Sequence, residues 1–295
     1  MGHGVRPVAH RVARAPASSA NLGPGFDALA VALALYVEVE VKPRPAGLLV
    51  VTEGEGAEIA TGPSHLAARL ATEVTGEDRL EVRVRSDIPV ARGLGSSAAL
   101  AVAAAAAAGA TNLLDRGFSI DHHPENAAAS VLGGLVAAAV VNGAPVALRL
   151  NLDPTFRFVV IIPARELETK AARAALPEMV SREDAVFNLG RMGLLVGGLA
   201  DHDRLFATAG DDRLHQGPRS VLFPEAPALL VGLREAGALT SCWSGAGPSL
   251  LGICRADDAA NVAEAAVPLM ERHGVAGRVA LLDPDLTGCR VEELD

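Results

Sequence analysis

Apolar and polar residues alternate strictly in two stretches of the chain. At 35–42 and at 80–85 every second side chain is apolar, which is the period at which a β-strand turns one face toward a core. Runs rich in β-branched and other apolar residues predict further strands at 134–141, 145–150, 156–162, 239–243, 249–253, 275–282 and 289–294. Asn142-Gly143 joins the first two of these runs and is typical of a hairpin turn.

Helical patterns fill most of the remaining chain. They predict helices at 65–75, 94–108, 126–132, 169–175, 181–199, 227–236 and 258–273. Ser64 is the expected N-cap of the first helix and Asp257 or Asp258 that of the last, because short polar side chains accept hydrogen bonds from first-turn N–H groups. The alternation of these strands and helices predicts an α+β protein with helices on one face of its sheets.

Length and composition limit the class of protein. The 295 residues, half of them apolar, suffice for two domains, which we place at 1–152 and 153–295. A net charge of −9 argues against binding nucleic acid. The N-terminus lacks a signal-peptide stretch, the alanine-rich run is too short for a membrane span, and the three cysteines form no Cys-x-x-Cys pair. We therefore expect a cytoplasmic protein that does not enter a membrane.

The clearest chemistry lies in Pro-Val-Ala-Arg-Gly-Leu-Gly-Ser-Ser-Ala-Ala at 89–99. These glycines and serines stand between a strand and the start of the alanine-rich helix. Unpaired N–H groups and the positive end of the helix dipole suit a phosphate at such a place. We expect nucleotide phosphates to contact the segment through Pro89, Arg92, Gly93, Leu94, Gly95, Ser96, Ser97, Ala98 and Ala99.

Other interpretations of this segment stay open. Gly93, Gly95 and Ala98 fit a loose dinucleotide-binding pattern, which needs an acidic residue at the end of the next strand. Asp115 and Asp121 fall instead in a stretch expected to be a loop. A Walker A loop requires a lysine that this segment lacks. An ordinary strand-to-helix turn is the remaining alternative.

Two more segments complete a known pattern: Ala-Pro-Ala-Ser-Ser-Ala-Asn-Leu-Gly-Pro-Gly-Phe-Asp at 15–27 and Ser-Gly-Ala-Gly-Pro-Ser at 244–249. Together with 89–99 they resemble the GHMP kinases, named after galactokinase, homoserine kinase, mevalonate kinase and phosphomevalonate kinase. The 15–27 segment resembles the homoserine kinase branch. The resemblance implies an N-terminal domain like ribosomal protein S5 and a C-terminal ferredoxin-like α/β sandwich. It also implies phosphorylation of the L-homoserine hydroxyl by ATP and Mg²⁺ in threonine biosynthesis.

Matched position by position, the resemblance assigns homoserine contacts to Asn21, Asp27, His123, Asn126, Thr169, Arg173, Arg219 and Gly245. An amide and a carboxylate suit an ammonium and a hydroxyl, and guanidinium groups suit a carboxylate. Thr169 and Arg173 are four residues apart, so they share a helix face. The residues alone also permit Asx turns at Asn21 and Asp27 and solvated surface arginines at 173 and 219.

The resemblance further implies a magnesium ion and an adenine subsite. Ser97 and Asp121 are the expected metal ligands, because a hard cation prefers oxygen, and Asp115 is the alternative. His65 stands where the family often has an asparagine near the adenine. Glu125 takes the place of an aspartate in the family pattern.

The residues expected to act on the reacting groups are Asn126, Asp27 and Ser97. No lysine lies near the phosphate segment, so the hydroxyl proton leaves to a phosphate oxygen, to solvent or to Asp27. Two other functions stay open: a related kinase for another small alcohol such as mevalonate or a sugar, and a non-catalytic ligand sensor. The resemblance is also compatible with a homodimer.

Overall fold

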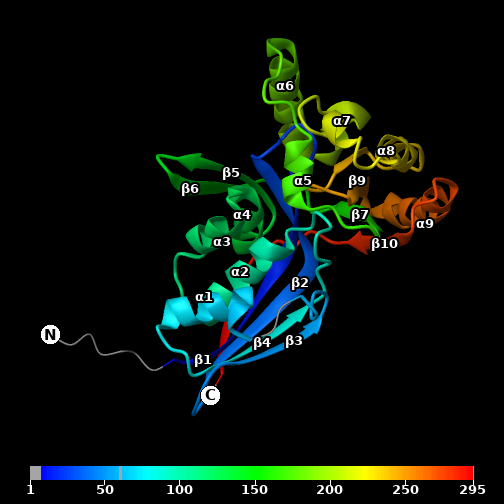
Figure 1. Ribbon diagram of the computed structural model, residues 1–295. Coiled ribbons are helices and arrows are strands. Elements are labelled where there is room, and N and C mark those ends of the chain that lie inside the picture. The colour runs from blue at the N-terminus through cyan, green and yellow to red at the C-terminus, as the bar shows by residue number, and fades with distance from the viewer. Residues whose placement is uncertain (1–7, 60–61, 295) are drawn as a thin grey trace.

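The computed structural model describes residues 8–59 and 62–294 and contains two sheets with helices packed beside them (Figure 1). The first sheet contains β1 (His10–Ala20), β2 (Leu29–Pro43), β3 (Leu49–Gly54), β4 (Leu80–Ser86), β5 (Leu135–Val141), β6 (Ala144–Leu150) and β11 (Arg290–Leu294). Its strands lie in the order β11-β1-β2-β4-β3, and the β5–β6 hairpin is attached to β2.

The central strand β2 confirms the alternating pattern. Val37, Val39 and Val41 are buried while Glu38 is exposed. The strand is longer than predicted because its first residues, 29–33, are buried on both faces and so lack alternation. A strand covered on both sides has no polar face to reveal its period.

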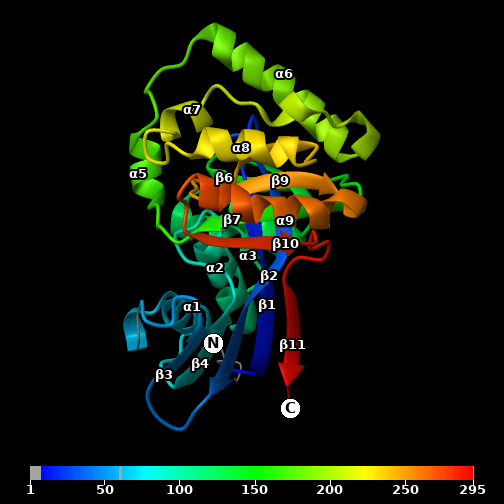
Figure 2. The same ribbon diagram turned by 90° about the vertical axis from the view of Figure 1, so that its right-hand side faces the viewer.

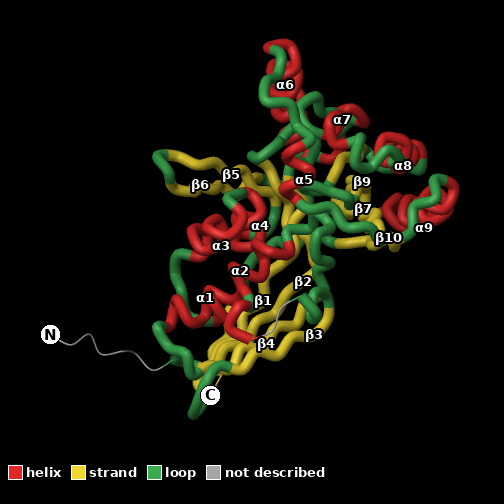
Figure 3. The backbone as a smooth tube through the Cα atoms, viewed as in Figure 1, coloured by secondary structure: helices red, strands yellow, loops and turns green. Residues whose placement is uncertain are grey.

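Four helices cover one face of the first sheet (Figure 3). They are α1 (Leu66–Thr75), α2 (Ser96–Ala107), α3 (Leu113–Asp121) and α4 (Pro124–Leu132), with a 3-10 turn at Gly62–Ser64. Helix α2 lies in the middle and packs against β1, β2 and the other three helices. Its alanines are almost completely buried, because small side chains allow close approach to all of these neighbours.

The second sheet is antiparallel, with the order β10-β7-β9-β8. Its strands are β7 (Phe156–Pro163), β8 (Thr240–Trp243), β9 (Leu250–Arg255) and β10 (Gly277–Leu282). The helices of this half are α5 (Thr169–Ala174), α6 (Arg182–Leu199), α7 (Gln216–Arg219), α8 (Ala226–Glu235) and α9 (Ala256–Arg272), with 3-10 turns at His202–Arg204 and Ala207–Gly210. Figure 2 shows α8 and α9 over one face of this sheet.

The two faces of strand β7 pack into two different hydrophobic cores. Val159 and Ile161 pack in the core beneath α8 and α9. Phe158 and Val160 point the other way and belong to a core shared with the first half of the chain. The two halves are therefore packed together through apolar contacts.

The chain crosses from the first sheet to the second between β6 and β7, next to the predicted division at 152/153. The predicted strand at 289–294 exists, but it returns to the first sheet. As β11 it pairs antiparallel with β1 (Figure 2). Within the described ranges, no helix is both long and apolar enough to cross a bilayer.

The stretch around Asp115 and Asp121, expected to be a loop, is helix α3. Gly117 obscures its helical character in the sequence, and packing explains that glycine. A Cβ at Gly117 would lie 2.6 Å from the Cβ of Ala127 on α4. The glycine therefore permits the close packing of α3 against α4.

Two predicted helix caps are also wrong. His65, not Ser64, is the N-cap of α1. Arg255, not Asp257 or Asp258, is the N-cap residue of α9. The two aspartates lie in the first turn instead, where the helix dipole favours negative charge.

Candidate active site

The three motif segments of the sequence meet in space. The N–H of Gly245 donates to the carbonyl of Ala20 (3.0 Å), and the Asn21 amide donates to the carbonyl of Gly245 (2.8 Å). The Ser244 hydroxyl donates to the carbonyl of Gly93 (2.7 Å). Direct hydrogen bonds thus connect segments that are far apart in the sequence.

A cleft of about 290 Å³ opens at this junction, and most of the predicted site residues line it. These are Asn21, Asp27, Pro89, Arg92, Gly93, Leu94, Gly95, Ser96, Ser97, His123, Asn126, Thr169, Arg173 and Arg219. Ala91, Glu125 and Ala246 line it as well. The structure therefore gathers one set of side chains from both halves of the chain.

Five predicted residues are placed differently. Ala98 and Ala99 are fully buried in the first turn of α2, so only their backbone can serve a ligand. Gly245 is bonded to Asn21 beside the cleft, and His65 lines a second cavity. The side chain of Asp121 lies outside the described residues, although its backbone ends α3.

The phosphate segment forms a tight turn into α2. Gly93 and Gly95 have φ values of 71° and 68°, in the left-handed region that favours glycine. A Cβ at Gly93 would lie 2.2 Å from the Ser244 carbonyl oxygen, and one at Gly95 would lie 2.0 Å from the Ser18 hydroxyl. Gly95 is the N-cap of α2 and provides no side-chain cap. The first-turn N–H groups of α2 therefore suit an external anion.

The Arg92 side chain is occupied by protein carbonyls. Its Nε donates to Pro163 (2.9 Å), Nη1 to Val90 (3.0 Å) and Nη2 to Ala164 (2.7 Å). Glu166 lies 3.3 Å from Nη1. These bonds tie the phosphate segment to the end of β7, so Arg92 holds the loop against the second half of the chain.

A charged pair spans the cleft next to this loop. Nη2 of Arg173, on α5, lies 2.6 Å from Oδ1 of Asp27. Both side chains are a little over one third exposed. Thr169 begins the same helix and lines the same cleft, as the four-residue spacing predicts.

Arg219, on α7, is a buried cation. It is 2% exposed, and no carboxylate of the described residues lies within ion-pair distance. Its Nη1 donates to the carbonyl of Gly245 (3.1 Å) and to Nδ1 of His215 (2.9 Å), and its Nε to the carbonyl of Ala172 (3.3 Å). Burial, followed by the charge of Arg173, lowers the pKa of Arg219 to about 10. An anionic ligand would compensate for the cost of removing this cation from water.

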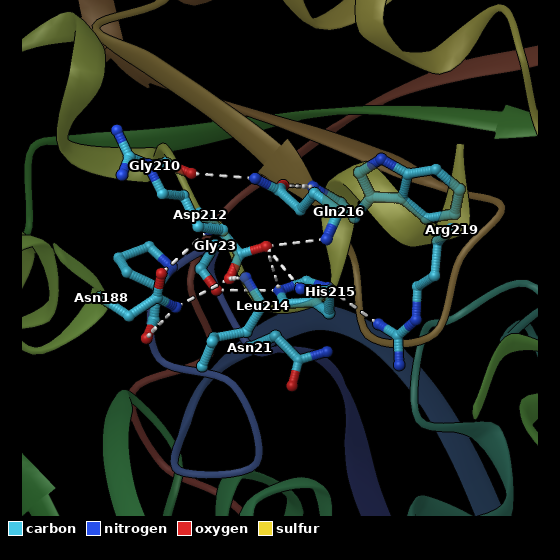
Figure 4. A network of polar contacts seen from close by, with 12 residues as sticks. Asn21, Gly23, Asn188, Gly210, Asp212, Leu214, His215, Gln216 and Arg219 are labelled. Carbon is cyan, nitrogen blue, oxygen red and sulfur yellow. Dashed lines mark hydrogen bonds and ion pairs between the residues drawn. The ribbon is translucent and has the colours of Figure 1, made fainter. Parts of the chain in front are cut away.

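The loop before α7 is built around a buried carboxylate (Figure 4). Oδ2 of Asp212 accepts from the backbone N–H groups of His215 (2.8 Å) and Gln216 (2.7 Å). Oδ1 accepts from the N–H of Leu214 (3.0 Å) and from the amide of Asn188 on α6 (2.7 Å). This carboxylate therefore fixes the start of α7 and, through that helix, the position of Arg219.

His215 lies inside this network and is fully buried. Its Nε2 lies 2.9 Å from the carbonyl of Gly23. Burial lowers the pKa of His215 to about 4, and the charge of Asp212 opposes that shift. The imidazole is consequently neutral at physiological pH.

Asn126, on α4, is oriented by a residue that the motif analysis did not single out. The Ser18 hydroxyl donates to its Oδ1 (2.9 Å), which leaves the amide nitrogen to donate to Oε1 of Glu125 (3.3 Å). His123 lines the cleft beside them. Burial, followed by the charge of Arg173, lowers the pKa of His123.

A second cavity of about 300 Å³ lies next to the α2 N-terminus. It shares Ser96 and Ser97 with the first cleft, and its lining is mainly apolar. His65 lines it, with Nδ1 accepting from the N–H of Ala67 (3.2 Å). Burial lowers the pKa of His65, and a neutral ring that accepts at Nδ1 carries its proton on Nε2.

The acidic residues differ in their relation to the cleft. Asp115 is exposed in the first turn of α3 and does not line it. Glu125 is 2% exposed and does line it, close to the phosphate turn. Among the described residues, no group of three or more acidic, histidine or cysteine side chains is arranged to hold a metal by itself.

Comparison with known proteins identifies the family. The model of the GHMP kinases N terminal domain matches residues 63–143, and that of the GHMP kinases C terminal domain matches residues 194–268. The chain belongs to the GHMP kinase family. The resemblance to this family is thereby confirmed.

Two curated relatives of this GHMP kinase and one similar solved structure are named homoserine kinases. The homoserine kinase of Rhodococcus erythropolis is 41% identical over 280 residues, 86% of this chain and 89% of that one. The homoserine kinase of Moorella thermoacetica is 37% identical over 286 residues, 92% and 96% of the two chains. A solved homoserine kinase from Cytophaga hutchinsonii matches with a TM-score of 0.85 at 24% identity, over 99% of both chains. The predicted two-domain α+β fold is confirmed.

Sequence reasoning did not assign four contributors to the site of this GHMP kinase: Ser18, Asp212 and His215, together with Glu125, which it noted only as a replacement for a family aspartate. Ser18 lies within the 15–27 motif, so the motif itself was its signal. Asp212 and His215 precede Arg219 by seven and four residues. That spacing is consistent with a capping acid and a helical neighbour.

Proposed function

We propose that this chain transfers the γ-phosphoryl group of ATP to the side-chain hydroxyl of L-homoserine, forming O-phospho-L-homoserine for threonine biosynthesis. One observation carries the proposal. Arg219 is a buried guanidinium that has no carboxylate of the described chain within ion-pair distance, in the same cleft as a helix N-terminus suited to phosphate. The cleft thus provides for two anionic ligands, and the homoserine kinase relatives name one that carries a carboxylate.

We place the carboxylate of homoserine against Arg219 and Arg173. A guanidinium offers paired donors that match the two carboxylate oxygens. Asp27 lies beside Arg173 and gives the ammonium group a negative partner. Asn21, Thr169 and the other assigned residues then enclose the amino acid, and the hydroxyl points toward Asn126 and the phosphates.

We place the triphosphate on the N–H groups at 93–98 and the base in the second cavity. Ser96 and Ser97 line both spaces, so one nucleotide can span them. In the reaction, a bond forms between the homoserine oxygen and the γ-phosphorus, the bond to the β-phosphate oxygen breaks, and ADP leaves. Catalysis of such a transfer depends on positioning and charge stabilisation.

Oxygen atoms near the phosphate turn fit a magnesium ion bound mainly through the nucleotide. We propose Ser97 and Glu125 as its protein contacts, with Asp121 as an alternative ligand. A magnesium ion in a kinase takes one or two protein oxygens together with phosphate oxygens. When bound, it neutralises charge on the β- and γ-phosphates.

Asn126 orients the hydroxyl in this proposal. Ser18 fixes its amide oxygen, and the amide nitrogen, which donates one hydrogen to Glu125, keeps a second hydrogen for the substrate hydroxyl. The hydroxyl proton passes to a phosphate oxygen, to solvent or to Asp27, the carboxylate nearest the arginines. We further propose that the reaction takes place in the cytoplasm and that the enzyme forms a homodimer.

The test is a coupled assay that follows ADP formation with ATP, magnesium and L-homoserine. A parallel panel contains mevalonate and a sugar alcohol. We expect turnover that depends on L-homoserine. Turnover on another alcohol alone would establish a different GHMP kinase, and nucleotide binding without any turnover would establish a ligand sensor.

A further inference from the structure

The hydrogen bonds of His215 determine its tautomer. A carbonyl oxygen can only accept, so the contact of Nε2 with Gly23 (2.9 Å) requires a hydrogen on Nε2. A neutral ring then has a lone pair on Nδ1. Nη1 of Arg219 lies 2.9 Å from that atom and donates to it (Figure 4). The ring therefore links the loop at residue 23 to the buried guanidinium.

The same bond orients the guanidinium. Its Nη1 is held by His215 and by the carbonyl of Gly245, and its Nε by the carbonyl of Ala172. Three acceptors that do not lie on one line fix the plane of a rigid guanidinium group. The donors left for a ligand are those of Nη2, on a residue that lines the cleft.

Phe26 completes the support. Its ring stacks on the imidazole of His215, with 5.0 Å between the ring centroids and 22° between the planes. The guanidinium carbons of Arg219 and Arg173 lie 5.4 Å and 5.6 Å from the centre of the same ring. One aromatic side chain thus contacts both arginines and the histidine.

We propose that His215 is a positioning residue that holds Arg219 in the orientation required to bind the substrate carboxylate, through a neutral imidazole whose Nδ1 accepts from the guanidinium. The proposal rests on the proposed function, because it assigns the purpose of Arg219. His215 does not touch the reacting atoms in this assignment. It therefore predicts an effect on amino-acid affinity and none on phosphoryl transfer at saturation.

The positive charge of Arg219 requires the imidazole ring of His215 to be neutral. The charged groups facing His215 are Asp212 from its own loop, with 3.8 Å between Nε2 and the carboxylate, Arg219 from α7, and Asp27 from the loop after β1. Protonation at Nδ1 would turn the acceptor into a donor and set a second cation against Arg219. Burial resists that protonation and holds the pKa near 4.

Two isosteric variants separate the two ring nitrogens. His215→Asn can place an amide oxygen where Nδ1 lies, and His215→Gln can place an amide nitrogen where Nε2 lies. In His215→Gln the KM for homoserine should rise about 10- to 100-fold, the ratio expected for losing a hydrogen bond to a charged group. In His215→Asn the rise should stay within about threefold. We expect kcat and the KM for ATP to be unchanged in both.

Several outcomes would overturn the proposal. Equal rises in KM in both variants, or a loss confined to kcat, would contradict positioning through Nδ1. An unchanged KM in folded His215→Gln would do the same. If neither variant folds, side-chain ¹⁵N NMR of the wild-type histidine decides, because the proposal requires the neutral Nε2–H tautomer from pH 6 to 8. Failure of the proposed function is separate, since wild-type enzyme would then neither bind nor phosphorylate L-homoserine.

Discussion

Asp27 and Arg173 place opposite charges side by side in the cleft, with 2.6 Å between Oδ1 and Nη2. The backbone of Asp27 is left-handed (φ 54°), and its N–H donates to Oδ1 of Asn21 (3.0 Å). These constraints hold the carboxylate next to the arginine. A free amino acid carries an ammonium and a carboxylate group a few ångströms apart. Asp27 and Arg173 can therefore exchange their mutual contact for contacts to these two groups.

Replacing Arg219 should chiefly weaken homoserine binding. Because its guanidinium is buried, Arg219→Ala should cost about 2–5 kcal/mol of binding free energy. Arg173→Ala removes a more exposed group and should cost less. The KM and Kd for homoserine measure both effects. Arg213→Ala is the matched control, since this arginine lies in the same segment with 44% of its side chain exposed. Unchanged affinity in Arg219→Ala would remove that residue from the carboxylate site.

Asp27→Asn tests proton transfer. If Asp27 accepts the hydroxyl proton, turnover at saturating homoserine should fall about 100-fold or more, the usual contribution of a positioned base. If it only contacts the ammonium group, the KM should rise while kcat falls a few-fold. We expect the second result, because Oδ1 is already paired with Arg173. A large loss of kcat at saturation would instead establish Asp27 as the base.

Gly95→Ala should damage the phosphate turn. Left-handed backbone costs a residue with a Cβ about 1–2 kcal/mol, and the new methyl group would displace the Ser18 hydroxyl from Asn126. We expect a higher KM for ATP together with a lower kcat. Gly143→Ala provides the control for backbone strain, because Gly143 is also left-handed (φ 81°) but a Cβ there meets no neighbour. Identical kinetics in the two variants would refute the role of the turn.

His215 should make the folded state sensitive to acid. Its pKa is about 4 in the folded protein and near 6.5 when unfolded. Between these values the unfolded chain binds a proton that the native chain does not, so stability falls as the pH drops from 6.5 toward 4. The slope from this group is about 1.4 kcal/mol per pH unit. Urea unfolding of the wild type and His215→Asn measures it, and parallel pH profiles would contradict the assignment.

With His65 in the second cavity, the enzyme should discriminate only weakly between ATP and GTP. Its Nδ1 caps α1, so the ring can offer a base only the Nε2–H donor. A single donor can bind N7, an acceptor that adenine and guanine share. A bidentate contact from an amide side chain instead distinguishes one base from another by about 1–3 kcal/mol. We expect KM values for ATP and GTP within about tenfold of each other. His65→Asn keeps a competent N-cap and should increase the preference for ATP; a wild-type preference above a hundredfold would contradict this.

Local pattern was enough for several elements that turn one face to water, although it did not predict the partly exposed strand β3. The alternation at 35–42 and 80–85 predicted β2 and β4, and Asn142-Gly143 predicted the β5–β6 turn. It failed where neighbours cover an element from several sides. The start of β2 is buried on both faces, and α3 contains a glycine that its packing against α4 requires.

The motif segments likewise identified most residues of the cleft, because backbone turns and charged ligand contacts demand particular residue types. They did not identify Glu125 as the buried acid beside the phosphate turn, nor Ser18 as the partner of Asn126. Ser18 and Asn126 are 108 positions apart, and 30 positions separate Glu125 from Gly95 in the phosphate turn. No local spacing specifies such contacts.

By itself, the sequence determined a helix start suited to phosphate, the amphipathic strands and the cationic side chains, since each follows from chemistry within a few residues. Only the tertiary structure decided that Arg219 is buried, that Asp27 lies beside Arg173, and that His215 bonds through a defined nitrogen. Burial and hydrogen-bond geometry depend on which distant segments exclude water together. The folded arrangement, rather than the order of residues along the chain, sets those distances.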